Sequence, residues 1–326
     1  MYGYDIYHEE QMLPIIKSVQ ENKNSHAYIF AGEAGLKKHL CAELLACSLV
    51  CKNQAQAPCL SCPECVRAKA HTHPDISYIT APKDRKTIGV DTMRALSDDC
   101  FIKPFSIGHK VYIIEGDELT EQAQNAFLKT LEEPPAYAVF IIICTDTSGL
   151  LTTVLSRCTQ VSFPPLPSAR IKEYIKKNYP DETRINFLAN YAEGNPGKID
   201  QIINDDNFEA LRITALENLA MLMSERLYSS YKVTEFLEKN KENVQEIFNL
   251  WLLFLRDVIL ISEGYPEKCV NSDLIDKLRT LSGRFSPQKA MYATKRITHA
   301  LEMLSRFVSL RAISLNLALS IKTKSY

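Results

Sequence analysis

Short runs of apolar residues alternate with helical segments in the first half of this chain, and each run is apolar at nearly every position. The clearest runs are Ala27–Ala31, Ile76–Ala81, Val111–Ile114 and Val139–Cys144, and Glu121–Glu133 is one of the helical segments between them. A strand that is apolar on both sides has to be covered on both sides, which is typical of a parallel sheet between two layers of helices. We therefore predict an α/β fold with a parallel sheet.

The second half changes to helical periodicity with almost no strand signal. A proline cluster, Pro164–Pro167, closes the α/β region, since proline stops a helix and suits the exit from a strand. Further breaks occur at Gly194–Gly197, near Gly264 and at Ser282. We expect three domains: an α/β core over residues 1–165, a small helical domain over residues 166–205 and an all-helical C-terminal domain over residues 206–326.

An apolar stripe runs along the predicted last helix. Its members are Leu301, Leu304, Val308, Ala312 and Leu315. Steps of three and four residues place them on one face of a single helix. Such a stripe indicates a core or a subunit interface rather than a ligand site.

The residues after the first apolar run are placed like a phosphate-binding loop, with a helical run behind them. In a working loop, a glycine before the lysine lets backbone amides approach the phosphates, the lysine neutralises them, and the next Ser or Thr binds magnesium. Gly32, Gly35 and Lys38 match that pattern. Lys37, however, stands at the second glycine, and His39 stands at the hydroxyl. We expect a vestigial loop that does not bind ATP productively, and a plain strand-to-helix turn is compatible with the same residues.

The acidic motif of an ATPase is altered as well. After the third apolar run the sequence reads Glu115, Gly116, Asp117 and Glu118, where a working ATPase usually has Asp followed by Glu. Which acid aligns with which is open, because a slip of one residue would bring Asp117 and Glu118 into register. Without the loop hydroxyl we expect no intrinsic ATP hydrolysis.

Four of the ten cysteines lie close together in the sequence: Cys51, Cys59, Cys62 and Cys65. Four thiolates around a tetrahedral Zn²⁺ form a closed structural site. The alternative of four scattered core thiols is disfavoured, because the hydrophilic segment Lys52–Gln56 is a poor place to bury cysteine. We predict structural zinc at the four cysteines, with His71 and His73 as neighbouring loop residues.

Arg157 follows the last apolar run and stands between Ser156 and Cys158 at the edge of the predicted core. It could form a surface ion pair. It could also be presented to a neighbouring subunit, where a guanidinium stabilises charge on a transferring phosphoryl group. The spacing alone does not choose between these roles.

Composition and charge narrow the class of protein. Ten cysteines in a chain of 326 residues, four of them in one metal-like module, favour a reducing compartment. We expect a cytoplasmic protein, because no apolar run approaches the roughly 20 residues that a bilayer requires and the first residues do not resemble a signal peptide.

The segment Lys277–Tyr326 has ten Lys or Arg against the single acid Glu302. Such a segment can face nucleic acid or an acidic partner, or it can be a solvated helical face.

Several of these motifs coincide in one family. They are residues His26–Phe30, His73–Asp75, Gln124–Pro135 and Leu155–Cys158, together with the four-cysteine module. On them the chain resembles the AAA+ clamp-loader subunits of bacterial DNA polymerase III, strongly over residues 5–163 and loosely over the helical remainder. The resemblance implies an AAA+ nucleotide-binding core with a zinc-module insertion at about residues 51–65, a small helical lid and an all-α C-terminal collar.

Two types of subunit in that family carry the cysteine module, the ATP-hydrolysing gamma/tau type and the delta-prime type, and the damaged loop favours the delta-prime type. The resemblance then implies a heteropentameric ring with gamma/tau and delta subunits, which loads a sliding clamp onto primed DNA as part of the polymerase holoenzyme. In that ring Arg157 is expected to act in trans as an arginine finger on a gamma/tau ATP site, with Ser156 and Cys158 shaping its presentation. Lys198 stands near the position where the lid of the family often has a nucleotide-sensing arginine, so sensing in cis is not expected.

Two other functions stay open on the sequence alone. An autonomous AAA+ ATPase with an unusual loop would turn over ATP by itself. A zinc-dependent nucleic-acid-binding module would use the basic C-terminal segment. Its aromatic and basic residues are not interleaved as in single-strand-binding proteins, so we expect the chain alone to bind DNA weakly and through phosphates.

Overall fold

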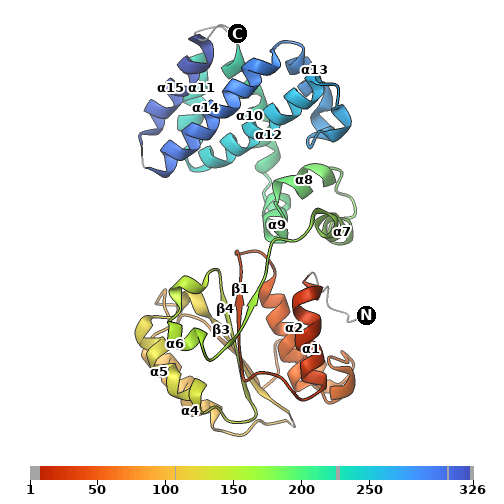
Figure 1. Ribbon diagram of the computed structural model, residues 1–326, viewed down its shortest axis with the longest axis vertical. Coiled ribbons are helices and arrows are strands. Elements are labelled where there is room, and N and C mark those ends of the chain that lie inside the picture. The colour runs from red at the N-terminus through yellow and green to blue at the C-terminus, as the bar shows by residue number, and fades with distance from the viewer. Residues whose placement is uncertain (1–7, 107, 225–227, 307, 324–326) are drawn as a thin grey trace. The chain divides into compact units, whose positions relative to one another are not determined.

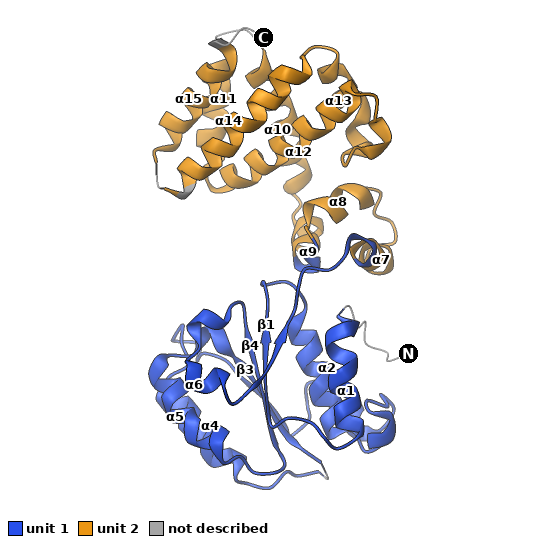
Figure 2. Ribbon diagram, viewed as in Figure 1, with its two compact units in different colours: residues 1–170, 194–197 blue, residues 171–193, 198–326 orange. Residues whose placement is uncertain are grey.

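The computed structural model describes residues 8–106, 108–224, 228–306 and 308–323. The chain divides into two compact units, of which unit 1 comprises residues 1–170 and 194–197 and unit 2 comprises residues 171–193 and 198–326 (Figure 2). Unit 1 contains a parallel sheet, and unit 2 is helical. Within the described residues, no helix is both long enough and apolar enough to cross a bilayer.

The sheet of unit 1 has five strands in the order β2-β3-β4-β1-β5. The strands are β1 (Ala27–Ala31), β2 (Ile76–Ile79), β3 (Lys110–Glu115), β4 (Ala138–Cys144) and β5 (Thr159–Ser162). Every pairing is parallel, and the register places Ala27 beside Phe140 and Tyr28 beside Thr159. The predicted α/β fold with a parallel sheet is therefore confirmed. Because the strands are parallel, the loops after β1, β3 and β4 meet at one edge of the sheet.

Helices cover both faces of this sheet (Figure 1). One layer is α1 (Glu9–Gln20), α2 (Lys38–Val50) and α3 (Pro63–Lys69), and the other is α4 (Val90–Cys100), α5 (Glu121–Glu132) and α6 (Thr152–Leu155). Alternate residues of β1 enter opposite cores: Tyr28 and Phe30 pack with the first layer, whereas Ala27 and Ile29 pack with the second. Burial on both sides explains why each strand is apolar throughout.

Local sequence sets both ends of α5. The hydroxyl of Thr120 accepts a hydrogen bond from the Ala123 amide at 3.2 Å, which caps the helix at its start. The helix ends at Glu132, just before Pro134 and Pro135, because proline lacks the amide hydrogen that a continuing helix needs. Glu132 is thereby placed in the last turn of α5.

Unit 2 is built from helices joined by short loops and 3₁₀ turns. The helices are α7 (Ser168–Asn178, whose first residues belong to unit 1), α8 (Ile185–Tyr191), α9 (Pro196–Asn204, likewise beginning in unit 1), α10 (Phe208–Met223), α11 (Tyr228–Lys239), α12 (Val244–Ser262), α13 (Ile275–Ser282), α14 (Pro287–Ser305) and α15 (Leu310–Thr323). The side chain of Arg212 in α10 is fully buried, with its guanidinium 3.8 Å from the ring centre of Phe187 and paired with Asp273 at 2.6 Å. A buried charge is tolerated here because it is paired and hydrogen-bonded. Unit 2 combines residues on both sides of position 205, so the finer boundary between lid and collar stays a prediction.

The prediction of a single last helix is wrong. Helix α14 ends at Ser305 and α15 begins at Leu310, so the predicted stripe is divided between two helices. The buried face of α15 is formed by Ile313, Leu317 and Ile321, whereas Leu315 is 41% exposed. The apolar steps of three and four residues continue from α14 into α15, so the periodicity alone does not reveal that one helix ends and another begins.

Candidate functional site

The predicted phosphate loop lies between β1 and α2, and its lysine bonds to the loop itself. The ammonium of Lys38 donates to the carbonyl oxygens of Gly32 and Glu33, the second at 2.9 Å, and the side chain is buried. Burial lowers the pKa of Lys38, although the nearby acids Asp117 and Glu115 oppose that shift. The cation that would neutralise a phosphate in a working loop is therefore engaged by backbone carbonyls.

Lys37 occupies a backbone conformation that favours glycine. Its φ is +62° and its ψ is 27°, in the left-handed region, directly before the first turn of α2. A residue with a Cβ costs about 1–2 kcal/mol in this conformation relative to the right-handed one. The backbone thus keeps the turn of a phosphate loop, while the side chain that the sequence places there is the wrong one for a cradle.

A distant segment packs directly on the loop within unit 1. The Asn195 amide donates to the Ala34 carbonyl at 2.7 Å, and the Gly197 amide donates to the Gly35 carbonyl at 3.0 Å. A Cβ on Gly197 would lie 2.5 Å from the Gly35 Cα, so the two backbones touch with no room for a side chain. Hydrogen bonds from Asn195 and Gly197, as well as those from Lys38, therefore fix the conformation of the loop.

The acids at the end of β3 and just after it have different partners in the structure. Glu115 ends β3, and its Oε1 lies 2.6 Å from Nε2 of His39, in the first turn of α2. Asp117 instead accepts the Thr145 amide at 2.9 Å, and Glu118 accepts the Ala81 amide at 2.6 Å. Glu115 thus contacts the first turn of α2 while Asp117 also acts on Lys38, and a hydrogen bond to Glu115 raises the pKa of His39.

Counted from Glu115 at the end of β3, Gly116 stands at the second position of the acidic motif, where a working ATPase has glutamate. A Cβ there would lie 2.7 Å from Cγ2 of Ile142 and 2.9 Å from the Ile143 carbonyl oxygen. The close approach of β3 to β4 therefore excludes any larger residue at this position. Glu115 and Asp117 lie near the loop, but each is engaged, Glu115 by His39 and Asp117 by the Thr145 amide.

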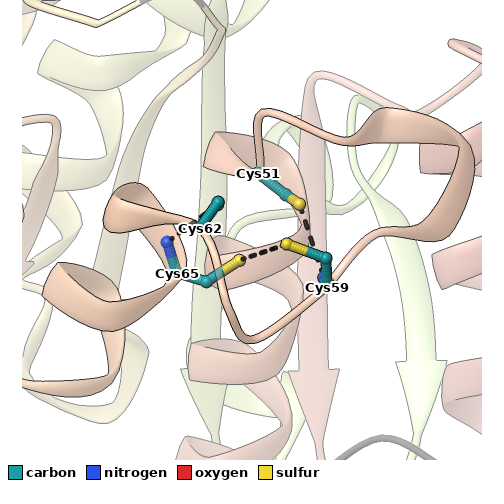
Figure 3. A group of neighbouring side chains, drawn as sticks. All are labelled: Cys51, Cys59, Cys62 and Cys65. Atoms are coloured by element: carbon teal, nitrogen blue, oxygen red, sulfur yellow. Dashed lines mark hydrogen bonds between the residues drawn. The ribbon is translucent and has the colours of Figure 1, made fainter.

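The four cysteines of the predicted zinc site converge (Figure 3). All four sulfur atoms lie within 4.8 Å of one another, and Cys59 and Cys65 approach to 4.0 Å. Four sulfurs bound to one Zn²⁺ at about 2.3 Å would lie about 3.8 Å apart, so a small contraction would complete a tetrahedron. The donor set therefore fits a structural metal ion.

Local backbone geometry builds this cluster from three segments. Cys51 ends α2, Cys59 follows in the loop, and Cys62 caps α3 by accepting the Cys65 amide at 3.4 Å. A hydrogen bond from the Ser61 backbone lowers the pKa of Cys59 to about 6, whereas burial raises the pKa of Cys51 to about 12. A bound cation would favour the thiolate at every position, because metal-bound thiols are deprotonated.

A buried polar network extends from the cysteine module and was missed in the sequence. Glu64, between two of the cysteines, lies 3.1 Å from Nε2 of His73, and Nδ1 of His73 accepts the Asp75 amide at 3.1 Å. The Asp75 carboxylate in turn accepts the amides of Phe105 and Ser106 at 2.6 and 2.8 Å. The motif His73–Asp75 was visible, but its partners are distant in sequence.

Arg157 lies just after α6 and contacts residues of its own chain. Its Nη2 is 2.5 Å from Oε1 of Glu132, and its Nη1 donates to the Thr153 carbonyl at 2.8 Å. The Arg157 side chain is 33% exposed, so part of the guanidinium faces solvent. Ser156 donates to the same carbonyl at 3.1 Å, and Cys158 packs against the second core.

Lys198 lies in α9 within unit 2. Its ammonium is 3.8 Å from the Glu193 carboxylate. It lines a cavity of about 670 Å³ together with Asp205 and Glu246. Lys198 belongs to unit 2, whereas the predicted phosphate loop belongs to unit 1.

Two family models match the chain. A model described as DNA polymerase III, delta subunit, matches residues 7–167, and a model of the C-terminal part of the same subunit matches residues 206–319. The DNA polymerase III subunit delta' of Bacillus subtilis is 28% identical over 271 residues, which is 81% of each chain. The subunit gamma/tau of Mycoplasma genitalium is 28% identical over 302 residues, which covers 86% of this chain and 48% of that protein. A gamma subunit-related structure from Thermotoga maritima covers 96% of this chain and 98% of its own at 17% identity, with a TM-score of 0.41.

Proposed function

Since the chain belongs to the DNA polymerase III delta subunit family and is a clamp-loader subunit of AAA+ type, we propose that it serves as the delta-prime subunit, a non-hydrolysing member of the ring. In this proposal it stands beside gamma/tau and delta subunits in a heteropentamer. The ring opens a sliding clamp and loads it onto primed DNA, and this subunit reaches the clamp and DNA through the complex. Residues 166–205 form its lid and residues 206–326 its collar domain.

One observation carries the absence of hydrolysis: the His39–Glu115 pair stands where a working site has a magnesium ligand and its acid. Lys38 is engaged by loop carbonyls, and Gly116 leaves no space for a water-activating carboxylate. Phosphoryl transfer depends on magnesium and on these positioned groups. The same contacts disfavour an autonomous ATPase.

Arg157 supplies the active contribution of the subunit in this proposal. It lies on unit 1 in a partly exposed loop, and its guanidinium presents a planar fork of N–H donors that suits phosphate oxygens. In a ring it would reach the phosphates of a gamma/tau ATP site and stabilise the charge of the transferring group, an effect worth about 10³ to 10⁵ in rate for such arginines. Ser156 and Cys158 fix the turn that presents it.

The cysteine module has a structural role in this proposal. Cys51, Cys59, Cys62 and Cys65 would hold Zn²⁺, which would close the loop between α2 and α3. The free energy of metal binding then contributes directly to folding of that segment. The closed set of four sulfurs leaves no position for a substrate.

The test is steady-state ATPase activity of the chain alone, and then of the ring with gamma/tau, delta, the clamp and primed DNA. We expect no turnover by the chain alone and a fall in turnover of the ring when Arg157→Ala is introduced. Arg85→Ala is a matched control, because Arg85 is an exposed arginine of the same unit that pairs with its neighbour Asp84. Turnover by the isolated chain would overturn the non-hydrolysing role, and a ring indifferent to Arg157→Ala would overturn the finger.

A further inference from the structure

The motif Gln124–Pro135 contains two adjacent glutamates, Glu132 and Glu133, whose surroundings differ. Glu132 lies in the last turn of α5 and pairs with Arg157. Glu133 follows the helix and lines a cavity of about 360 Å³ between α4 and α5, with Arg94 and Lys129 on its walls. The chain therefore directs one of two identical side chains toward the arginine and the other away from it.

The guanidinium of Arg157 is held along one side. Nη1 donates to the Thr153 carbonyl at 2.8 Å and lies 3.3 Å from the Ser156 hydroxyl, while Nη2 meets Glu132 at 2.5 Å. A guanidinium carries five N–H donors in a planar fork, so these partners leave donors for an incoming anion. The bonds that hold Arg157 come from two elements, α5 and α6, that are packed in the same core.

From this geometry we infer that Glu132 is a positioning residue for Arg157. The inference rests on the proposed finger role of Arg157. A free arginine side chain samples many rotamers, and ordering it on arrival at a phosphate lowers the rate that it can support. Glu132 and the Thr153 carbonyl order the side chain beforehand, so that its remaining donors face the neighbouring subunit. In this inference Glu132 acts only through its contact with Arg157.

A first experiment uses the isolated full chain with ¹⁵N-labelled arginine. Rotation of the guanidinium about its Nε–Cζ bond is slow when carboxylate and carbonyl bonds hold it and fast when they do not. We expect Glu132→Gln to speed that rotation for Arg157, assigned by its loss in Arg157→Ala, and Glu133→Gln to leave it unchanged. Equal rotation rates in the wild type and in Glu132→Gln would overturn the inference.

A second experiment measures turnover of the complete ring with clamp and primed DNA. An exposed ion pair is worth little, so we expect Glu132→Gln to lower kcat by about threefold to fivefold with little change in KM. Glu132→Asp should recover part of that loss, and Glu133→Gln should behave as wild type. The melting temperature of each variant chain shows whether a loss arises from unfolding.

The two substitutions combined separate this inference from the proposed function. If Glu132 acts through Arg157, Glu132→Gln has no further effect once Arg157→Ala is present. An equal loss in both backgrounds, or a gain in turnover on Glu132→Gln alone, would overturn the positioning role while leaving the finger intact. If Arg157→Ala leaves the turnover of the ring unchanged, the proposed finger role of Arg157 is itself wrong.

Discussion

His39 Nε2 lies 2.6 Å from Glu115 Oε1, so the first turn of α2 is joined by a side-chain contact to the end of β3. In a working ATPase these two elements are bridged by magnesium and its ligands. Here two protein side chains make the connection, and the strength of their pairing depends on a proton.

The His39–Glu115 pair predicts a pH-dependent contribution to stability. The hydrogen bond to Glu115 raises the pKa of His39 above its ordinary value of about 6.5. The contribution is therefore complete below about pH 6.5 and is lost as pH rises through the folded-state pKa. His39 is largely exposed, so we expect the melting temperature of the wild type to exceed that of His39→Gln by about 2 °C or less near pH 6, and by nothing near pH 9.

The wild type has to be compared with the variant, because other histidines contribute to stability with the opposite pH dependence. Burial lowers the pKa of His8, His73 and His109, so these residues favour the folded state as pH rises. Both proteins share that background, and the difference between them isolates His39. A difference that grows toward alkaline pH would contradict the pairing.

Removal of metal should destabilise the cysteine module. We expect one zinc per chain by elemental analysis and a lower melting temperature after chelation. Cys62→Ser should reproduce that shift and be insensitive to chelator, since Cys62 both caps α3 and supplies a sulfur. Cys269→Ser, in unit 2, is the control for loss of a thiol. A protein without zinc, or a melting curve unchanged by chelation, would exclude the structural role.

The buried Asp75 should hold the segment that contains Phe105 and Ser106. Burial alone would raise the pKa of Asp75, but hydrogen bonds from Ser106 and Phe105 outweigh it and hold the pKa below its ordinary value. Asp75→Ala leaves those donors without their acceptor, which we expect to cost about 2–3 kcal/mol in urea unfolding. Hydrogen exchange at residues 101–106 should rise, whereas the exposed Asp84→Ala should change neither quantity. Unchanged exchange in Asp75→Ala would show that the segment is held by other contacts.

The crossing of Gly35 and Gly197 should not tolerate a methyl group. Gly197→Ala places a Cβ 2.5 Å from the backbone of Gly35, and neither backbone can move aside without breaking the bonds of Asn195. We expect a loss of about 1–3 kcal/mol in unfolding free energy. Gly149→Ala is the control, because nothing lies within 4 Å of its added Cβ. Equal stability of the two variants would mean that the crossing yields easily.

Sequence was most informative where neighbours along the chain determine the outcome. The all-apolar runs predicted the parallel sheet, since burial on both sides leaves that mark on each strand separately. The four cysteines were visible for the same reason, because their spacing alone brings the sulfurs within reach of one another. The ends of α5 follow from a capping threonine and a proline pair.

Other features depended on distant partners and were out of reach. The sequence did not show which acid contacts the loop, because the contact joins Glu115 to His39, 76 residues away in sequence. The contact between Glu64 and His73 was not predicted, because neither residue lies in a local pattern that indicates a partner. The sequence predicted one last helix instead of two, because the spacing of apolar residues is the same in α14 and α15.

Gly116 limits the substitutions by which this chain could acquire a working ATPase site. A Cβ at this position would lie 2.7 Å from Cγ2 of Ile142 and 2.9 Å from the Ile143 carbonyl oxygen, so a glutamate introduced there would force β4 to shift. Restoring a catalytic loop would also require new residues at positions 37 and 39. In the role that we propose, we therefore expect no single substitution to create an ATPase site, and we expect the one at position 116 to destabilise the fold.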